Sequence, residues 1–238
     1  MIINLISGPR NISTALMTSF AQRTDTKVLD EPFYAYYLEK TGIDHPGREE
    51  TLASLSSDLD DILTRIESLE KESKHVFVKN MAHHIIDMDL SLLLNCKNVF
   101  LIRDPKALIA SYSKVISKPS LDDIGIKQST KIFDYLKSET EETPVVLNSN
   151  EILKNPAKTL GKLCEKLGIH FDEKMLTWEK GKVYDPVPWS KYWYTNTLNS
   201  TGFAKPKNGQ INLTDYGYKL YREALPFYEL LNQHSIRA

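Results

Sequence analysis

The chain has 238 residues, of which 41% are hydrophobic and 26% are charged, and its formal net charge is −1. These values are typical of a globular protein and favour one domain over residues 1–238. The balanced charge argues against general nucleic-acid binding, and two cysteines are too few for a disulfide framework or a structural zinc site. We expect a cytoplasmic protein, because no apolar run approaches the ~20 residues of a membrane span and the first residues read as a strand.

Apolar patterns alternate between strand and helix along the first part of the chain. A short apolar run at 2–6 predicts a strand, and the period changes to helical after Pro9. A second strand is expected at 27–33, and the segment 34–50, rich in Tyr, Gly and Pro, is expected to carry a loop. Apolar residues then recur every three or four positions from 52 to 69, which predicts one long amphipathic helix.

The alternation continues along the rest of the chain. Strands are expected at 75–79, 98–105 and 144–148, and each is followed by a helical pattern. A terminal helix is expected from about Thr214. Strands that alternate with helices predict a parallel, doubly wound sheet, whose ligands bind at the carboxyl ends of the strands.

The segment SGPRNIST, residues 7–14, joins the first strand to the first helix. Backbone N–H groups at such a helix start bind anions, Arg10 adds positive charge, and Ser13 and Thr14 add hydroxyl donors. A magnesium-dependent nucleotide-binding loop would read G-x-x-x-x-G-K-[ST], and Ser13 and Thr14 stand where its glycine and lysine would be. The acidic strand end VLDE, residues 28–31, suits magnesium, but the missing lysine disfavours a kinase or NTPase.

A second polar cluster lies in NVFLIRDPKALIASYSKV, residues 98–115. Arg103 ends a strand, and Ser111 follows eight residues later, about two turns into the next helix. The two side chains can therefore converge on one anion at the edge of the sheet. Taken separately, each also suits a structural role: an ion pair of Arg103 with Asp104, and close packing for Ser111.

Together these segments resemble the sulfotransferase superfamily, which transfers a sulfuryl group from 3′-phosphoadenosine 5′-phosphosulfate. Members carry a 5′-phosphosulfate loop like GxPRSGTT after the first strand, with which residues 8–14 align without a gap. They also carry a 3′-phosphate motif RdPxxxxxS, which Arg103 and Ser111 match in type and spacing. The stretch 149–176 is similar to a further family segment, so the likeness runs from residue 2 to about 180.

The resemblance implies a P-loop NTPase-like three-layer α/β fold of the sulfotransferase type, with a central parallel sheet. The residues that it assigns to the 5′-phosphosulfate are Arg10, Asn11, Ile12, Ser13 and Thr14, and those that it assigns to the 3′-phosphate are Arg103, Ser111 and, in a late basic loop, Lys205 and Lys207. Ile12 replaces the family glycine, so we expect a backbone without a positive φ at this position.

Sulfuryl transfer needs a base on the acceptor and positive charge near the departing phosphate, and Arg10 suits the second role. For the base, Glu31 at the end of the second strand is similar to the proposed base of one bacterial branch, although it can also act only as a cap or a partner of Arg10. Lys79 matches the lysine of the KTH motif of cytosolic animal members. Met81 stands in place of its histidine, and His83, or less readily His84, is the alternative base.

We therefore expect a sulfotransferase that uses 3′-phosphoadenosine 5′-phosphosulfate and a small-molecule hydroxyl or amine, with no metal, nucleic acid or membrane. The aromatic stretch 184–203 is expected to stack on a substrate or to cover the sheet edge. Two alternatives remain: a P-loop kinase or NTPase, and a non-catalytic nucleotide-binding relative, for which Ile12 is the argument. A pyridoxal-phosphate enzyme is a remote third, and a homodimer is compatible with the sequence.

Overall fold

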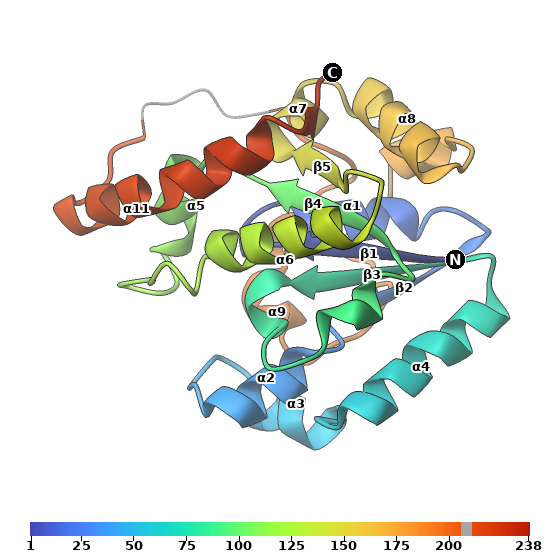
Figure 1. The fold of residues 1–238 in the computed structure, drawn as a ribbon, viewed down its shortest axis with the longest axis horizontal. Coiled ribbons are helices and arrows are strands. Elements are labelled where there is room, and N and C mark those ends of the chain that lie inside the picture. The colour runs from blue at the N-terminus through green and yellow to red at the C-terminus, as the bar shows by residue number, and fades with distance from the viewer. Residues whose placement is uncertain (206–210) are drawn as a thin grey trace.

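The computed structural model describes residues 1–205 and 211–238, and its centre is a parallel sheet between layers of helices (Figure 1). The sheet has six strands in the order β2-β3-β1-β4-β5-β6, and every pair of neighbours is parallel. The strands are β1 (Ile2–Ser7), β2 (Thr26–Asp30), β3 (His75–Met81), β4 (Lys97–Ile102), β5 (Val145–Asn148) and β6 (Ser235–Ile236). The prediction of an α/β fold with a central parallel sheet is confirmed.

Helices cover both faces of the sheet (Figure 1). The α-helices are α1 (Ser13–Phe20), α2 (Tyr34–Thr41), α3 (Arg48–Ser54), α4 (Leu59–Glu72), α5 (Pro105–Tyr112), α6 (Ile126–Glu139), α7 (Ser149–Lys154), α8 (Pro156–Leu167), α9 (Ser190–Trp193), α10 (Thr195–Leu198) and α11 (Asp215–Asn232). Short 3-10 turns occupy Ala82–His84, Leu90–Leu93 and Glu173–Leu176.

The hydrophobic core around the sheet consists of two clusters, one on each face of the sheet, because successive side chains of a strand point to opposite faces. In β1, Leu5 belongs to the cluster that includes residues of α1 and α8, and Ile6 belongs to the cluster that includes residues of α4, α6 and α11. Successive side chains of a strand point to opposite faces, so a run that is apolar throughout is buried on both sides. This is why the central strands read as continuous apolar segments.

Between residues 34 and 69 the structure contains more helices than predicted. The loop expected in 34–50 lies between α2 and α3, which were not predicted there, and the expected single helix at 52–69 is divided into α3 and α4. The division falls at Asp58, whose side chain accepts hydrogen bonds from the backbone N–H of Asp60 and Asp61 at 2.8 and 3.2 Å. This N-cap starts a new helix even though the apolar spacing continues through it.

Two further boundaries differ from the prediction. The second strand ends at Asp30, before Pro32, because Glu31 adopts a φ of 46°. The last strand, β6, was not predicted, since its two residues are too few for a detectable alternation. Among the described residues, none of the helices combines the length and apolarity needed to cross a bilayer.

Candidate functional site

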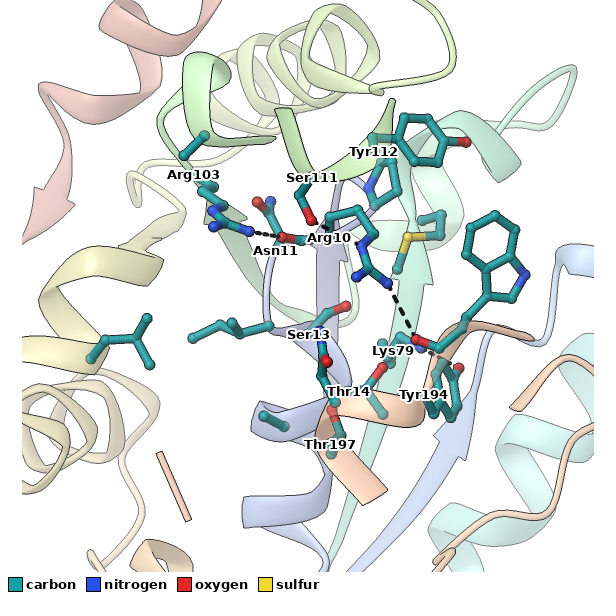
Figure 2. A pocket seen from close by; sticks show the side chains of 18 of the residues that line it. Arg10, Asn11, Ser13, Thr14, Lys79, Arg103, Ser111, Tyr112, Tyr194 and Thr197 are labelled. Carbon is teal, nitrogen blue, oxygen red and sulfur yellow. Dashed lines mark hydrogen bonds between the residues drawn. The ribbon is translucent and has the colours of Figure 1, made fainter. Parts of the chain in front are cut away.

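A cavity of about 1010 Å³ opens at the carboxyl ends of the strands (Figure 2). Its walls come from the loop after β1 (residues 9–15), from the ends of β2 and β3, from α5, and from residues 193–205. Small-molecule sites commonly measure ~300–1,000 Å³, so this cavity is at the large end of that range. The candidate residues that line it are Arg10, Asn11, Ile12, Ser13, Thr14, Glu31, Lys79, His83, His84, Arg103, Ser111 and Lys205, whereas Lys207 lies outside the described residues.

The loop after β1 contains two non-glycine residues in the left-handed backbone region. Arg10 has a φ of 59° and Ile12 a φ of 62°, so the expectation that Ile12 avoids a positive φ was wrong. Tertiary contacts explain the difference: the Asn11 side-chain amide donates to the Leu101 carbonyl at 2.6 Å, and Ile12 packs against a core cluster. Strained backbone of this kind persists only where the surroundings hold it in place, and it is common at functional sites.

Glycine is required at the start of this loop for a different reason. A Cβ on Gly8 would lie 2.4 Å from the backbone oxygen of Ile124, which no real Cβ tolerates. The segment before α6 therefore presses directly on the loop. This contact helps to hold Arg10 and the start of α1 at the cavity.

Two arginines and a serine converge at one end of the cavity. The Nε of Arg10 donates to the Oγ of Ser111 at 3.2 Å, and its Nη1 donates to the Trp193 carbonyl at 3.3 Å. Nη1 of Arg103 donates to the backbone oxygen of Arg10 at 2.6 Å. Burial lowers the pKa of both guanidiniums, and Arg10 further lowers that of Arg103. Two partly desolvated cations so close together are an environment that favours an anionic ligand.

The ion pair between Arg103 and Asp104, which was the structural alternative for Arg103, does not form part of this arrangement. The Asp104 side chain instead caps α5 by accepting from the Lys106 N–H at 2.8 Å, and Pro105 occupies the first turn. This cap turns the chain from β4 into α5. Ser111 is thereby carried back to the same cavity as Arg103.

Lys79 is fully buried at the other end of the cavity, and its ammonium group is saturated with hydrogen bonds. Nζ donates to Asp30 Oδ1 at 2.6 Å, to Glu31 Oε1 at 2.7 Å and to the Tyr194 hydroxyl at 2.7 Å. An ammonium has three N–H donors, so none is left for a ligand. Burial by itself lowers the pKa of Lys79, but Asp30 and Glu31 outweigh it and raise that pKa above its ordinary value.

Tyr194 connects this network to the aromatic segment 184–203. Its hydroxyl donates to Asp30 Oδ2 at 2.6 Å and accepts from the indole N–H of Trp189 at 2.9 Å, in addition to the bond from Lys79. Burial raises the pKa of Asp30 to about 6 against the opposing effect of Lys79. The acidic strand end that was considered for magnesium thus holds a lysine and a tyrosine, which sequence reasoning did not identify as its partners.

Glu31 has one fixed carboxylate oxygen and one without a described partner. Its backbone N–H donates to the Lys79 carbonyl at 2.7 Å, which helps to hold the strained φ of 46°. Oε1 accepts from Lys79, whereas Oε2 lies 3.8 Å from Nδ1 of His84, beyond hydrogen-bond distance. The side chain is 9% exposed and lines the cavity. Glu31 therefore pairs with Lys79 and not with Arg10.

Buried histidines and tyrosines pack beside Glu31. His84 stacks on Tyr34 with ring centroids 4.6 Å apart, and His83 meets the ring of His84 edge-on at 4.5 Å. Burial lowers the pKa of His83 to about 3 and that of His84 well below its ordinary value, so both rings are neutral. His45, which sequence reasoning missed, also lines the cavity, and its Nδ1 lies 3.1 Å from the Tyr34 hydroxyl. An isolated histidine in a predicted loop carries no signal for such a position.

An all-parallel α/β fold with an anion site at a helix start defines a broad class of proteins that bind phosphorylated or sulfated ligands. A family model for a sulfotransferase domain matches residues 1–235. The chain belongs to this sulfotransferase domain family.

Solved sulfotransferases share the fold. The sulfotransferase domain of a Synechococcus olefin synthase is 17% identical, with 94% of each chain covered and a TM-score of 0.55. A sulfotransferase from Alicyclobacillus acidocaldarius is 12% identical, with 100% of this chain and 97% of that chain covered and a TM-score of 0.53. A mouse sulfotransferase, SULT7A1, complexed with PAP is 11% identical, with 98% and 87% covered and a TM-score of 0.50. The predicted membership of the sulfotransferase superfamily is confirmed.

Two curated relatives carry a different name. The branched-chain-amino-acid aminotransferase-like proteins 1 and 2 of Arabidopsis thaliana are each 32% identical over 234 residues. The match covers 98% of this chain but 42% of each relative, so the chain spans about two fifths of their length. Their name describes those longer proteins.

Proposed function

We propose that this chain transfers a sulfuryl group from 3′-phosphoadenosine 5′-phosphosulfate to a hydroxyl or amine of a small molecule and releases adenosine 3′,5′-bisphosphate. The observation that carries the proposal is the convergence of Arg10, Arg103 and Ser111 beside the start of α1, within one cavity. A donor with anionic groups at both its 3′ and 5′ positions needs two such cationic contacts. The structural neighbour described as complexed with PAP supports the same assignment.

The donor is proposed to lie across the loop and α5. Arg10, Ser13, Thr14 and the backbone of Asn11 and Ile12 would hold its 5′ end, where the N-terminus of α1 favours negative charge. Arg103 and Ser111 would hold its 3′-phosphate. Lys205, which lines the same cavity, would add charge at that end. The corresponding role for Lys207 stays a prediction.

The reaction is proposed to be a direct displacement with Glu31 as the base. Oε2 of Glu31 would take the proton of the acceptor while the acceptor oxygen or nitrogen forms its bond to sulfur. The bond from sulfur to the bridging oxygen of the donor breaks, and Arg10 neutralises the charge on the departing phosphate. Lys79 holds Oε1 of Glu31 and has no free N–H, so its proposed role is to position the base.

The structure weakens two of the alternatives, His83 as the base and a non-catalytic relative. His83 is a poor base, because burial lowers its pKa to about 3. The argument for a non-catalytic relative was that Ile12 cannot follow the backbone of a glycine, but Ile12 has a φ of 62°. The sequence argument for that alternative therefore fails, because Ile12 adopts the backbone conformation that a glycine would have at this position.

A thermal-shift titration tests the donor site. A ligand that binds only the folded state at 100 times its Kd stabilises that state by about 2.7 kcal/mol. We expect adenosine 3′,5′-bisphosphate to raise the Tm, ATP with magnesium to have little effect, and Arg103→Ala to abolish the shift. Arg222→Ala, which removes an exposed arginine from α11, is the matched control and should leave the shift intact.

Other outcomes would redirect the assignment. An equal shift with ATP and magnesium that survives Arg103→Ala would support the nucleotide kinase or NTPase alternative. Binding of adenosine 3′,5′-bisphosphate without transfer to any hydroxyl or amine acceptor would support a nucleotide-binding relative without activity.

A further inference from the structure

The cavity has two chemically different ends. One end carries the cations Arg10 and Arg103, together with Ser111. The other, which we call the acceptor pole, consists of Glu31, Tyr34, His45, His83 and His84, all of which line the same cavity. In Figure 2, Arg10 lies between Arg103 and Ser111 on one side and Lys79 and Tyr194 on the other. Arg10 therefore marks the boundary between the two ends.

The acceptor pole is a continuous set of contacts. His84 joins Glu31, at 3.8 Å between Nδ1 and Oε2, to Tyr34, whose ring it stacks on. The Tyr34 hydroxyl in turn lies 3.1 Å from Nδ1 of His45. A ligand whose hydroxyl reaches Glu31 thus lies against aromatic and imidazole rings.

The lysine at this pole has no hydrogen-bonding capacity left for a ligand. Among the described residues, Lys79 is the cation that contacts the pole, and its three N–H groups go to Asp30, Glu31 and Tyr194. Arg10 at the boundary uses two of its five N–H groups on Ser111 and the Trp193 carbonyl, and the proposed function assigns the others to the donor. An acceptor with its own negative charge would therefore compete with the donor for its counter-charge.

The surrounding charge is instead neutral to negative. Burial lowers the pKa of His45, His83 and His84, so these rings carry no charge at neutral pH. Asp123 opposes this effect at His45 and His83, which places a further carboxylate near the pole. Glu31 and Asp30 share one lysine, so the two carboxylates outnumber their buried cation.

We propose that the acceptor pole selects an alcohol that carries no carboxylate, phosphate or sulfate group, whether the alcohol is uncharged or bears an amine. The inference rests on the proposed sulfuryl transfer and deepens it by specifying the acceptor. A buried anion without a partner is strongly disfavoured, and repulsion from Glu31 adds to that effect. Uncharged and aminated alcohols avoid both penalties and can use the aromatic walls.

Three benzyl alcohols of matched size test the proposal: 4-methylbenzyl alcohol, 4-(aminomethyl)benzyl alcohol and 4-(hydroxymethyl)benzoate. Each is supplied with 3′-phosphoadenosine 5′-phosphosulfate, and the sulfated product is quantified. We expect kcat/KM for the neutral and aminated alcohols to exceed that for the carboxylate at least tenfold. A carboxylate that reacts as fast as the others would overturn the proposal. Failure of both the neutral and the aminated alcohol to react would also overturn it, because both belong to the proposed class of acceptors.

A charge variant gives a second, independent measurement. His45→Lys adds a cation to the pole, so it should raise kcat/KM for the carboxylate and lower it for the aminated alcohol. Ser138→Lys adds the same charge at an exposed position of α6 and should change neither. Carboxylate turnover that does not respond to His45→Lys contradicts the proposal.

The donor-site titration separates this inference from the proposed function. If adenosine 3′,5′-bisphosphate fails to raise the Tm of the wild-type chain, the proposed function fails. If it raises the Tm and the benzoate is nevertheless the best acceptor, only the acceptor inference fails.

Discussion

At the scale of single residues, backbone strain is concentrated at the cavity. The described chain has four non-glycine residues with positive φ, and three of them, Arg10, Ile12 and Glu31, line the cavity. Such conformations cost ~1–3 kcal/mol each, so their surroundings must hold them. For Glu31 the holding contact is its N–H bond to the Lys79 carbonyl, at 2.7 Å. Three strained residues thus line one cavity, among them the proposed base Glu31 and Arg10.

Gly8→Ala tests the close contact that shapes the loop. A Cβ 2.4 Å from the Ile124 oxygen forces a backbone shift, so we expect the free energy of unfolding to fall by about 1–3 kcal/mol. Gly161→Ala in α8 is the control, because its Cβ would meet nothing within 4 Å and alanine favours a helix by up to ~1 kcal/mol. Urea denaturation of both variants measures the effect. If Gly8→Ala were as stable as the wild type, the backbone around Ile124 would be able to move away from residue 8 at no cost in free energy.

Glu31→Gln tests the proposed base. Glutamine keeps the side-chain volume but cannot take a proton, so we expect kcat to fall by about 10²–10⁴. The Tm shift from adenosine 3′,5′-bisphosphate should remain, since Glu31 lies outside the proposed donor contacts. His83→Asn should lower kcat less than tenfold, because the neutral imidazole is a weak base. The reverse ranking of the two variants would assign the base to His83.

At the scale of elements, the late segment that contains α9 and α10 completes a network built on β2 and β3. Tyr194 binds both Lys79 and Asp30, and the Trp193 carbonyl accepts from Arg10. A segment that contributes to both ends of the cavity can couple the proposed donor and acceptor sites. Sequence patterns indicated only that its aromatic residues suit stacking or cover.

Tyr194→Phe tests this role. The variant leaves one N–H of Lys79 and the carboxylate of Asp30 short of a partner, which costs about 1–3 kcal/mol in a buried site. We expect lower stability and a lower kcat, with the Tm shift from adenosine 3′,5′-bisphosphate retained. Tyr192→Phe is the matched control, since Tyr192 is 42% exposed. If Tyr194→Phe had the kcat of the wild type, Tyr194 would not be needed to position Glu31.

At the scale of the whole molecule, the buried histidines make stability depend on pH. Burial lowers the pKa of His83 from its ordinary value of 6.5 to about 3, and it also lowers the pKa of His84 and His45. The unfolded chain therefore binds more protons than the folded chain below about pH 6.5. The stability that these neutral rings contribute is present above pH 6.5 and is lost as the pH falls below it.

The expected slope is at most about 1.4 kcal/mol per pH unit for each histidine. Asp30 acts in the opposite direction as the pH falls through about 6, because its folded pKa of about 6 lies above the ordinary 3.8 and favours the protonated folded state. Urea denaturation of the wild type between pH 7.5 and 6.0 therefore measures the histidine effect reduced by the partly protonated Asp30, and the difference from His83→Gln isolates the contribution of His83. Stability should fall across this window, and His83→Gln should flatten the fall. An unchanged slope in His83→Gln would mean that His83 is not held neutral.

Patterns along the chain predicted much of the fold. Alternating strands and helices indicated the parallel sheet, since burial on both faces requires continuous apolar strands whatever their partners are. The eight-residue spacing of Arg103 and Ser111 indicated that both reach one cavity, because about two turns of α5 bring the serine back to the strand end. These features depend on local geometry, which neighbouring residues determine.

Tertiary structure decided the backbone conformations and hydrogen bonds that depend on residues distant in sequence. Ile12 takes a positive φ because Asn11 is tied to Leu101, 90 residues away, and local preference alone predicts the opposite. Lys79 is saturated in part by Tyr194, 115 residues away, which no spacing rule relates to it. The sequence by itself thus determined the parallel sheet, the loop between β1 and α1, and the family likeness. Which groups remain free to meet a ligand was decided only by packing, because a hydrogen-bond donor is available or occupied according to what the folded chain brings beside it.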